Sequence, residues 1–169
     1  MVANEITIRV ATPADLEPLS VLIAASYATL GEAAYDREKL AAAMPLMSRA
    51  NPTLLASGTY FIAETDGQIA GCGGWTFEKP GNGERVDGIA HIRHFATHPA
   101  HHRKGVARLL LQRCLDEAAR AGATIMKSQS TLLAEPFYAS AGFRRVRPID
   151  VEMSPGIVLP VVEMERSLP

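Results

Sequence analysis

The sequence has few cysteines, almost no net charge and no long apolar run, and each shortage excludes a class of protein. The two cysteines, Cys72 and Cys114, lie far apart in predicted elements, which indicates reduced core thiols rather than a disulfide or metal framework. A net charge of −1 argues against a general nucleic-acid-binding protein, whose affinity requires a basic face. No apolar segment reaches the length needed to cross a membrane.

The start of the chain, Met1 to Glu5, also lacks the pattern of a signal peptide. The chain has 169 residues, of which 47% are hydrophobic, so it can form a real core and is not expected to be disordered. We therefore expect one domain over residues 1–169, in a cytoplasmic protein that binds neither nucleic acid nor membrane.

Acidic residues are missing from one long stretch. No Asp or Glu occurs between Asp87 and Asp116, although a helix is predicted to start there. The N-terminus of a helix carries a partial positive charge, so acidic residues are favoured in its first turn. Here the first turn carries Arg103, Lys104 and Arg108 instead. The pattern predicts that an anionic ligand binds at the start of this helix.

The residues around this helix start support an anion site. A strand predicted over Ile89 to Thr97 ends just before Pro99, and the helix is predicted to begin at about Arg103 to Gly105. Gly105 and the small Ala107 would let an anion approach the backbone. The alternative is a basic, solvated loop before an ordinary helix, because short glycine motifs are weak signals. Neither the Walker A spacing nor a G-x-G-x-x-G fingerprint is present.

The segment from Thr97 to Ala107 resembles V-x-P-x-x-[QR]-x-x-G-x-[GA], the pyrophosphate-binding motif of the GNAT superfamily of acyl-CoA N-acyltransferases. Thr97 stands where Val is common, and His102 stands where Gln or Arg is usual. Neither departure removes a backbone donor. The resemblance implies acetyl-CoA (coenzyme A) as cofactor, with pantetheine along the strand and the pyrophosphate at the helix. The cofactor-binding residues that it implies are Phe95, Ala96, Thr97, His102, Arg103, Lys104, Gly105, Val106, Ala107 and Arg108.

A second segment, Phe137 to Phe143, is similar to the F-Y-x-x-x-G-F element near the end of many GNAT enzymes. In the family the Tyr points at the cofactor sulfur, so the resemblance implies that Tyr138 is the general acid for the departing thiolate. The alternative is an aromatic pair that only packs a short helix onto the sheet. Family members often carry an Asn shortly before this element, and here Thr131, Leu132 and Leu133 occupy that region.

All five histidines fall between His91 and His102. We expect no metal site, because His91 and His94 are predicted on opposite faces of a strand and no Cys or carboxylate is close in sequence. Either of these two is a candidate for the base that takes the proton of an acceptor amine, since neutral imidazole is available near pH 7. Asp87 and Glu78 are further candidates for the same role.

The predicted elements follow the order β-α-α-β-β-β-α-β-α-β-β, which is similar to that of the GNAT fold. The first helix is predicted to start at Thr12 as N-cap, and the second to cover Asp36 to Arg49 with an interruption near Pro45. We expect an α/β (α+β) architecture with a mixed, mostly antiparallel sheet of about seven strands and about four flanking helices. The helix after Gly105 is expected to bury Val106, Leu109, Leu110, Cys114 and Ala118.

The resemblance implies an N-acetyltransferase that moves the acetyl group of acetyl-CoA to a primary amine. The sequence does not identify the acceptor, which we expect the first two helices and the loop Pro80 to Gly88 to recognise. A non-catalytic acyl-CoA-binding module is the alternative, and it would need the anion site but neither Tyr138 nor a base. A structural subunit whose strand Ile157 to Val162 pairs with a partner is a third alternative. A homodimer through this strand is compatible with enzyme activity.

Overall fold

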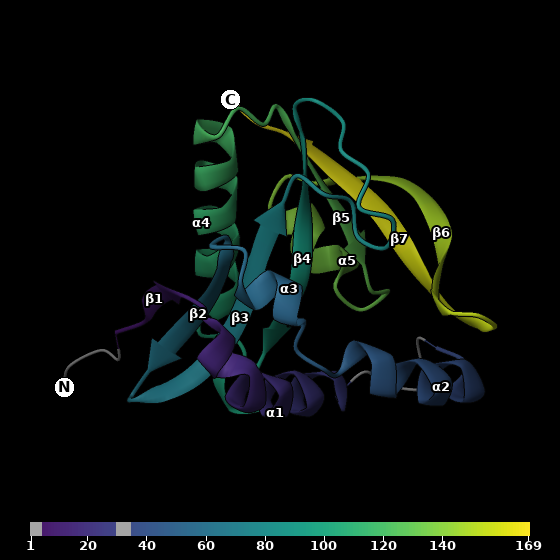
Figure 1. Cartoon of the computed structure of the whole chain (residues 1–169), viewed down its shortest axis with the longest axis horizontal. Coiled ribbons are helices and arrows are strands. Elements are labelled where there is room, and N and C mark those ends of the chain that lie inside the picture. Colours follow the sequence, from purple (N-terminus) through teal and green to yellow (C-terminus); the bar gives the residue numbers. More distant parts are fainter. Residues whose placement is uncertain (1–4, 30–34) are drawn as a thin grey trace.

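A computed structural model describes residues 5–29 and 35–169 of the chain (Figure 1). Met1 to Asn4, part of the segment inspected for a signal peptide, lie outside the described residues. The strands form one sheet of seven in the order β1-β2-β3-β4-β5-β7-β6. Only the β4–β5 pair is parallel among these described pairs. The mixed, mostly antiparallel sheet confirms the expected architecture.

The order of elements also confirms the prediction, with the short α3 as an addition. The strands are β1 (Thr7–Val10), β2 (Tyr60–Thr65), β3 (Gln68–Thr76), β4 (Ile89–Thr97), β5 (Ile125–Ser130), β6 (Arg144–Ser154) and β7 (Ile157–Ser167). The helices are α1 (Leu16–Tyr27), α2 (Arg37–Met47), α3 (Pro52–Leu55), α4 (Val106–Arg120) and α5 (Glu135–Ser140). Short 3₁₀ turns cover Pro13–Asp15 and Pro99–His101.

The helices cover both faces of the sheet (Figure 1). α4 and α5 pack with the largest core cluster on one face, where α4 contacts β2, β3 and β4. α1 and α3 pack on the opposite face, and α2 packs there against β7 near the tip of the long β6–β7 hairpin. In the described part of the chain no helix is both long and apolar enough to cross a membrane.

Local sequence signals fix the start of α1. Thr12 begins the turn before it, as predicted, and the Asp15 carboxylate accepts a hydrogen bond from the Thr12 backbone N–H at 2.8 Å. Arg9 on β1 donates to both oxygens of this carboxylate at 2.9 and 3.0 Å. The guanidinium of Arg9 lowers the pKa of Asp15, chiefly through these hydrogen bonds. The helix is therefore tied to the edge of the sheet.

Two helical details differ from the prediction. α2 is not interrupted at Pro45 but continues to Met47, and beyond the proline the Ser48 N–H still donates to the Met44 carbonyl at 3.0 Å. On α4, Leu109 is 45% exposed, whereas Leu111 and Leu115 are buried. The buried stripe is centred on the side of Leu111 and Cys114, and Leu109 points away from it.

β4 has two irregular features that shape the centre of the molecule. It pairs with β5 only over Ile89 to His91, and beyond this point the two strands separate. It also bulges against β3, where His94 and Phe95 lie opposite the single residue Gly73. His94 has a φ of 48°, which is rare for a residue with a side chain. The separation opens the sheet, and the bulge directs side chains of β4 toward the opening.

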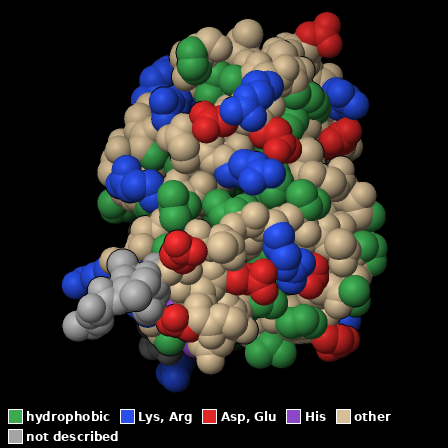
Figure 2. Space-filling model, turned by 90° about the vertical axis from the view of Figure 1, so that its left-hand side faces the viewer, with side chains coloured by type: hydrophobic (Ala, Val, Ile, Leu, Met, Phe, Trp, Pro, Cys, Tyr) green, Lys and Arg blue, Asp and Glu red, His purple; other side chains and the backbone are tan. Residues whose placement is uncertain are grey.

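The surface on the side of β1 and α4 carries mixed charges. Figure 2 shows Asp and Glu side chains interspersed with Lys and Arg on this face, between hydrophobic side chains, rather than a patch of one sign.

Candidate cofactor and catalytic site

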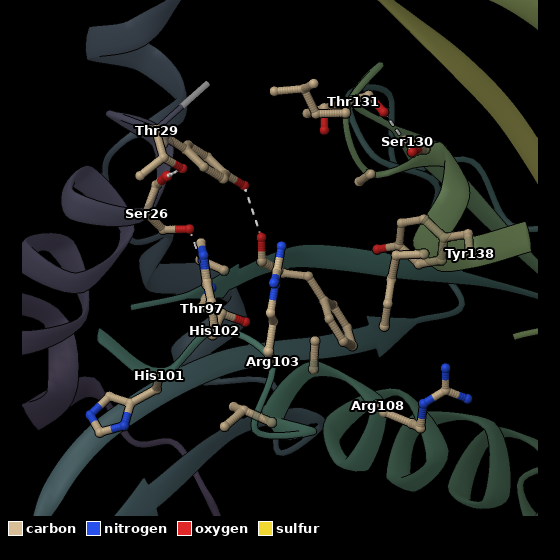
Figure 3. Close-up of a pocket in the computed structure, with 18 of the residues that line it drawn as sticks. Ser26, Thr29, Thr97, His101, His102, Arg103, Arg108, Ser130, Thr131 and Tyr138 are labelled. Carbon is tan, nitrogen blue, oxygen red and sulfur yellow. Dashed lines mark hydrogen bonds between the residues drawn. The ribbon is translucent and has the colours of Figure 1, made fainter. Parts of the chain in front are cut away.

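A cavity of about 640 Å³ lies where β4 and β5 separate (Figure 3). Its walls come from the end of α1, the second half of β4, the turn before α4, the end of β5 and the start of α5. The structure brings nine of the ten sequence-predicted cofactor residues to this cavity. The nine are Phe95, Ala96, Thr97, His102, Arg103, Gly105, Val106, Ala107 and Arg108.

The start of α4 supplies backbone donors at one end of the cavity. The first N–H groups of the helix, on Val106, Ala107 and Arg108, have no carbonyl acceptor within it. Gly105 precedes them with a φ of 82°, and it has no side chain that could cap them. Arg103 also has a positive φ, of 63°, so the backbone turns twice in the left-handed region before the helix. This geometry exposes N–H groups to a ligand.

The charge around these donors is positive. Among the described residues that line the cavity there is no Asp or Glu, whereas Arg103 and Arg108 both line it. Arg108 contacts the Ser140 hydroxyl of α5 at 3.3 Å, and its charge is not neutralised by this contact. Lys104 does not line the cavity, and its Nζ lies 3.4 Å from Nδ1 of the buried His101. This end of the cavity therefore suits an anion.

Side chains from other elements hold the bulged part of β4. The Tyr27 hydroxyl donates to the Phe95 carbonyl at 3.2 Å, and the Tyr60 hydroxyl donates to the His94 carbonyl at 2.6 Å. The Thr97 backbone N–H donates to the Ser26 hydroxyl at 3.2 Å. These contacts tie the cavity wall to α1 and β2.

Tyr138 lies on α5 across the cavity from α1, and Figure 3 shows its hydroxyl pointing inward. The residue is 5% exposed, and its ring contacts those of Phe137 and Phe143. Burial raises the pKa of Tyr138 well above its ordinary value, so the phenol keeps its proton at neutral pH. No hydrogen-bond partner of its hydroxyl occurs in the described part of the chain. A protonated donor is thus available at the cavity wall.

The two candidate histidine bases lie in different environments, and neither lines this cavity. His94 is half-buried, and its Nε2 lies 2.8 Å from the Met47 carbonyl. A carbonyl only accepts, so Nε2 carries the proton. His91 lies where β4 and β5 still pair, beside a second, smaller cavity. Burial, followed by nearby cations, lowers the pKa of His91 to about 4. Glu78 is exposed and paired with Arg85 at 3.3 Å.

Several residues that line the cavity were not predicted as site residues. Ser26, Tyr27 and Thr29 come from the end of α1, and Gln129 and Ser130 from the end of β5. No local motif marks them, because they reach the cavity only through the docking of α1 and the divergence of β5. His101 also lines the cavity, and its place in the histidine-rich window was the only signal for it.

The buried polar groups give no indication of a metal centre. Within residues 5–29 and 35–169 no three His, Cys, Asp or Glu side chains come together as metal ligands. Both cysteines are buried free thiols, and burial raises the pKa of each.

The fold and the cavity have two features that together characterise a class of protein. These are a split mixed sheet and a cationic helix start at the opening. The sequence model of the family described as "Acetyltransferase (GNAT) domain" matches residues 56–145. This match spans β2 to the start of β6 and includes both motifs noted above. The chain belongs to the GNAT acetyltransferase family. A comparison with curated protein sequences found no match.

Solved structures show the same fold over nearly the whole chain. A GCN5-related N-acetyltransferase from Rhodopseudomonas palustris is 22% identical, covers 99% of both chains and has a TM-score of 0.80. The PaiA N-acetyltransferase from Thermoplasma acidophilum, solved in complex with coenzyme A, is 16% identical over 96% of this chain and 99% of that chain, with a TM-score of 0.70. The yncA protein from Salmonella typhimurium, solved with its cofactor acetyl-CoA, is 24% identical over 98% and 95%, with a TM-score of 0.65.

Proposed function

We propose that this protein binds acetyl-CoA in the cavity between β4 and β5 and transfers the acetyl group to a primary amine. One observation carries the proposal: a cationic helix start, with no carboxylate among the described lining residues, shares a cavity with the hydroxyl of Tyr138. The start of α4 would bind the pyrophosphate through its N–H groups, Arg103 and Arg108. Phe95 to Thr97 would line the pantetheine. Complexes of structural neighbours with coenzyme A and acetyl-CoA support this assignment.

In this proposal Tyr138 is the general acid. The amine nitrogen forms a bond to the acetyl carbon while the carbon–sulfur bond breaks, and the leaving thiolate takes the phenolic proton. The phenol is protonated at neutral pH, so it can donate as the thiolate forms. The ring is fixed between Phe137 and Phe143, so the hydroxyl is held in one orientation.

The base that takes the amine proton is proposed to be His91, either directly or through water. It lies at the point where β4 and β5 meet, which is the closed end of the split. Its lowered pKa keeps it neutral, and therefore able to accept a proton, over the physiological range. If this assignment holds, the acid limb of kcat/KM falls nearer pH 4 than pH 6.5. We assign His94 a supporting role, because its ring holds the bulge against α2.

Two measurements test the proposal. Calorimetry should show that acetyl-CoA binds far more tightly than dephosphorylated pantetheine. Added salt should weaken the binding of acetyl-CoA. A screen over amine classes that follows release of free thiol should then find an acceptor. Equal affinity for both ligands would contradict the anion site.

A non-catalytic acyl-CoA-binding module is the second candidate. It would use the same helix start but would not need Tyr138 at the cavity. Tight binding of acetyl-CoA without thiol release over the whole amine panel would favour this module. A cytoplasmic location and a homodimer through β7 stay predictions.

A further inference from the structure

A second cavity, of about 100 Å³, lies at the closed end of the split between β4 and β5. His91 and Lys127 form the last pair between the two strands, and both line this cavity. Gln129, two residues further along β5, lines both cavities. A cofactor bound as proposed, with its pyrophosphate at α4, would extend along the split, and its reactive end would point toward Gln129.

The floor of this second cavity holds a buried carboxylate that is paired with two more exposed cations. Glu163 on β7 is 8% exposed, and its carboxylate lies 3.5 Å from Nζ of Lys127 and 2.9 Å from Nε of Arg147. Two cations therefore face one carboxylate at this position. The loop between β3 and β4 closes the other side with Lys79 and with Glu84, which is exposed to solvent.

Cations dominate the charges that act on His91, although the carboxylates of Glu84 and Glu163 also line the cavity. Besides burial, which is the largest cause, Lys127, Arg93 and Lys79 lower its pKa, and Glu163 opposes them with the smallest effect. Arg93 is held beside the site, because it donates to the Thr76 hydroxyl at 2.8 Å. A positive environment stabilises an anionic group and destabilises an ammonium ion.

We propose that the second cavity is the acceptor site and that it takes an amine that also bears a carboxylate, as an α-amino acid does. The inference rests on the proposed function and deepens it. Lys127 and Lys79 would bind the carboxylate, and the same positive charge would lower the pKa of the acceptor ammonium and so favour the free amine. A volume of this size holds only a few water molecules, which suits an amino-acid head group rather than a long chain.

The first experiment compares matched acceptors. Each common L-amino acid is tested beside its carboxamide and beside the amine formed by its decarboxylation, with thiol release as the readout. The carboxylate-bearing member of at least one set should have a kcat/KM roughly 10- to 100-fold above both others, the size of one hydrogen bond to a charged group. Polyamines should have a still lower kcat/KM, because they bring additional positive charge into the cavity.

The second experiment removes the proposed carboxylate partners one at a time. Lys127→Met and Lys79→Met keep the aliphatic stem and remove the charge. Each should raise KM for the preferred amino acid roughly tenfold more than it raises KM for the carboxamide, because only the amino acid loses a charged partner. Lys39→Met is the matched control, because Lys39 is exposed on α2 and lines neither cavity. A merely structural role of Lys127 would change both acceptors equally.

The outcomes distinguish a failure of this inference from a failure of the proposed acetyl transfer on which it rests. If acetyl-CoA does not bind, both are wrong. If acetyl-CoA binds and amines are acetylated, but the carboxamides or decarboxylated amines react as well as the amino acids, only the acceptor inference is overturned. Calorimetric titration of amino acids into the CoA-saturated protein gives a readout without turnover, and binding of the amino acid but not its carboxamide supports the inference.

Discussion

The ring of Phe95 lies directly over the backbone of Gly73 on the neighbouring strand. A Cβ atom at position 73 would overlap three atoms of this ring. Gly73 is the single residue opposite the β4 bulge, so its missing side chain is what allows the bulged strand to lie flat against β3. The position of Phe95 in the cavity wall therefore depends on a glycine in another strand.

Replacing Gly73 with Ala should push Phe95 into the cavity between β4 and β5. We expect acetyl-CoA affinity to fall by about tenfold, in keeping with the cost of roughly 1–3 kcal/mol for overpacking a tight site. Calorimetry on the folded variant measures the change. The double variant Gly73→Ala/Phe95→Leu should recover much of the affinity, since the smaller side chain makes room. Equal loss in both variants would mean that Phe95 is not displaced.

Tyr138→Phe removes the proposed acid proton and keeps the ring between Phe137 and Phe143. We expect kcat to fall by about 10² to 10⁴, with acetyl-CoA affinity and thermal stability nearly unchanged. Tyr35→Phe is the control, because it also removes a buried hydroxyl. This hydroxyl does not line the cavity, and it accepts from the Leu132 N–H at 2.9 Å. Wild-type turnover in Tyr138→Phe would refute the acid role, and unfolding would indicate that Tyr138 is a core residue.

Gly105→Val tests the helix start as an anion site. A β-branched residue is strained at a φ of 82°, and its Cβ would point into open space, where we place the pyrophosphate. Gly122→Val is the matched control at the other end of α4, with a φ of 100° and equally open surroundings. Both variants should lose stability, and only Gly105→Val should lose acetyl-CoA affinity. Similar binding losses in the two variants would point to helix damage rather than to a ligand site.

The stability of the protein should depend on pH through His91. Its pKa is about 4 in the folded chain, against an ordinary value of 6.5. As pH falls below 6.5, the unfolded chain takes up a proton that the folded chain does not, so this contribution to stability is present at neutral pH and is lost toward pH 4. The loss amounts to at most about 3 kcal/mol. Urea unfolding at pH 7 and pH 4 should show a smaller decline for His91→Asn than for the wild type, whereas His102→Asn, at an exposed position, should decline as the wild type does.

The parts of the fold that the sequence predicted are those with strong local signals. β4 was predicted with the bounds that the structure gives it, because the run of residues that favour a strand is broken at His98-Pro99. The start of α4 was found within a few residues, because Gly105 and a change in apolar period both mark it. Leu109 was misassigned, because a helical stripe read from sequence has no fixed centre until the helix packs on its sheet.

The rest of the site depends on long-range contacts. Tyr27 and Phe95 lie 68 positions apart, and Ser26 and Thr97 lie 71 apart, so no motif could associate them. The bulge at His94 was likewise hidden, since it arises from pairing with Gly73 on another strand. The resemblance supplied the role of Tyr138, and the structure adds the burial that keeps this phenol protonated.

Only three residue pairs join β4 to β5, although seven strands form one sheet. This short parallel ladder is a seam between a block of β1 to β4 and a block of β5 to β7. A ligand that fills the split would contact both blocks and so stabilise the short contact between them. Amide hydrogen exchange at Ile125 to Lys127 should therefore slow more on cofactor binding than exchange within β2 or β3, which are paired along both edges. Opening of the seam and release of the cofactor would then be one thermodynamic event.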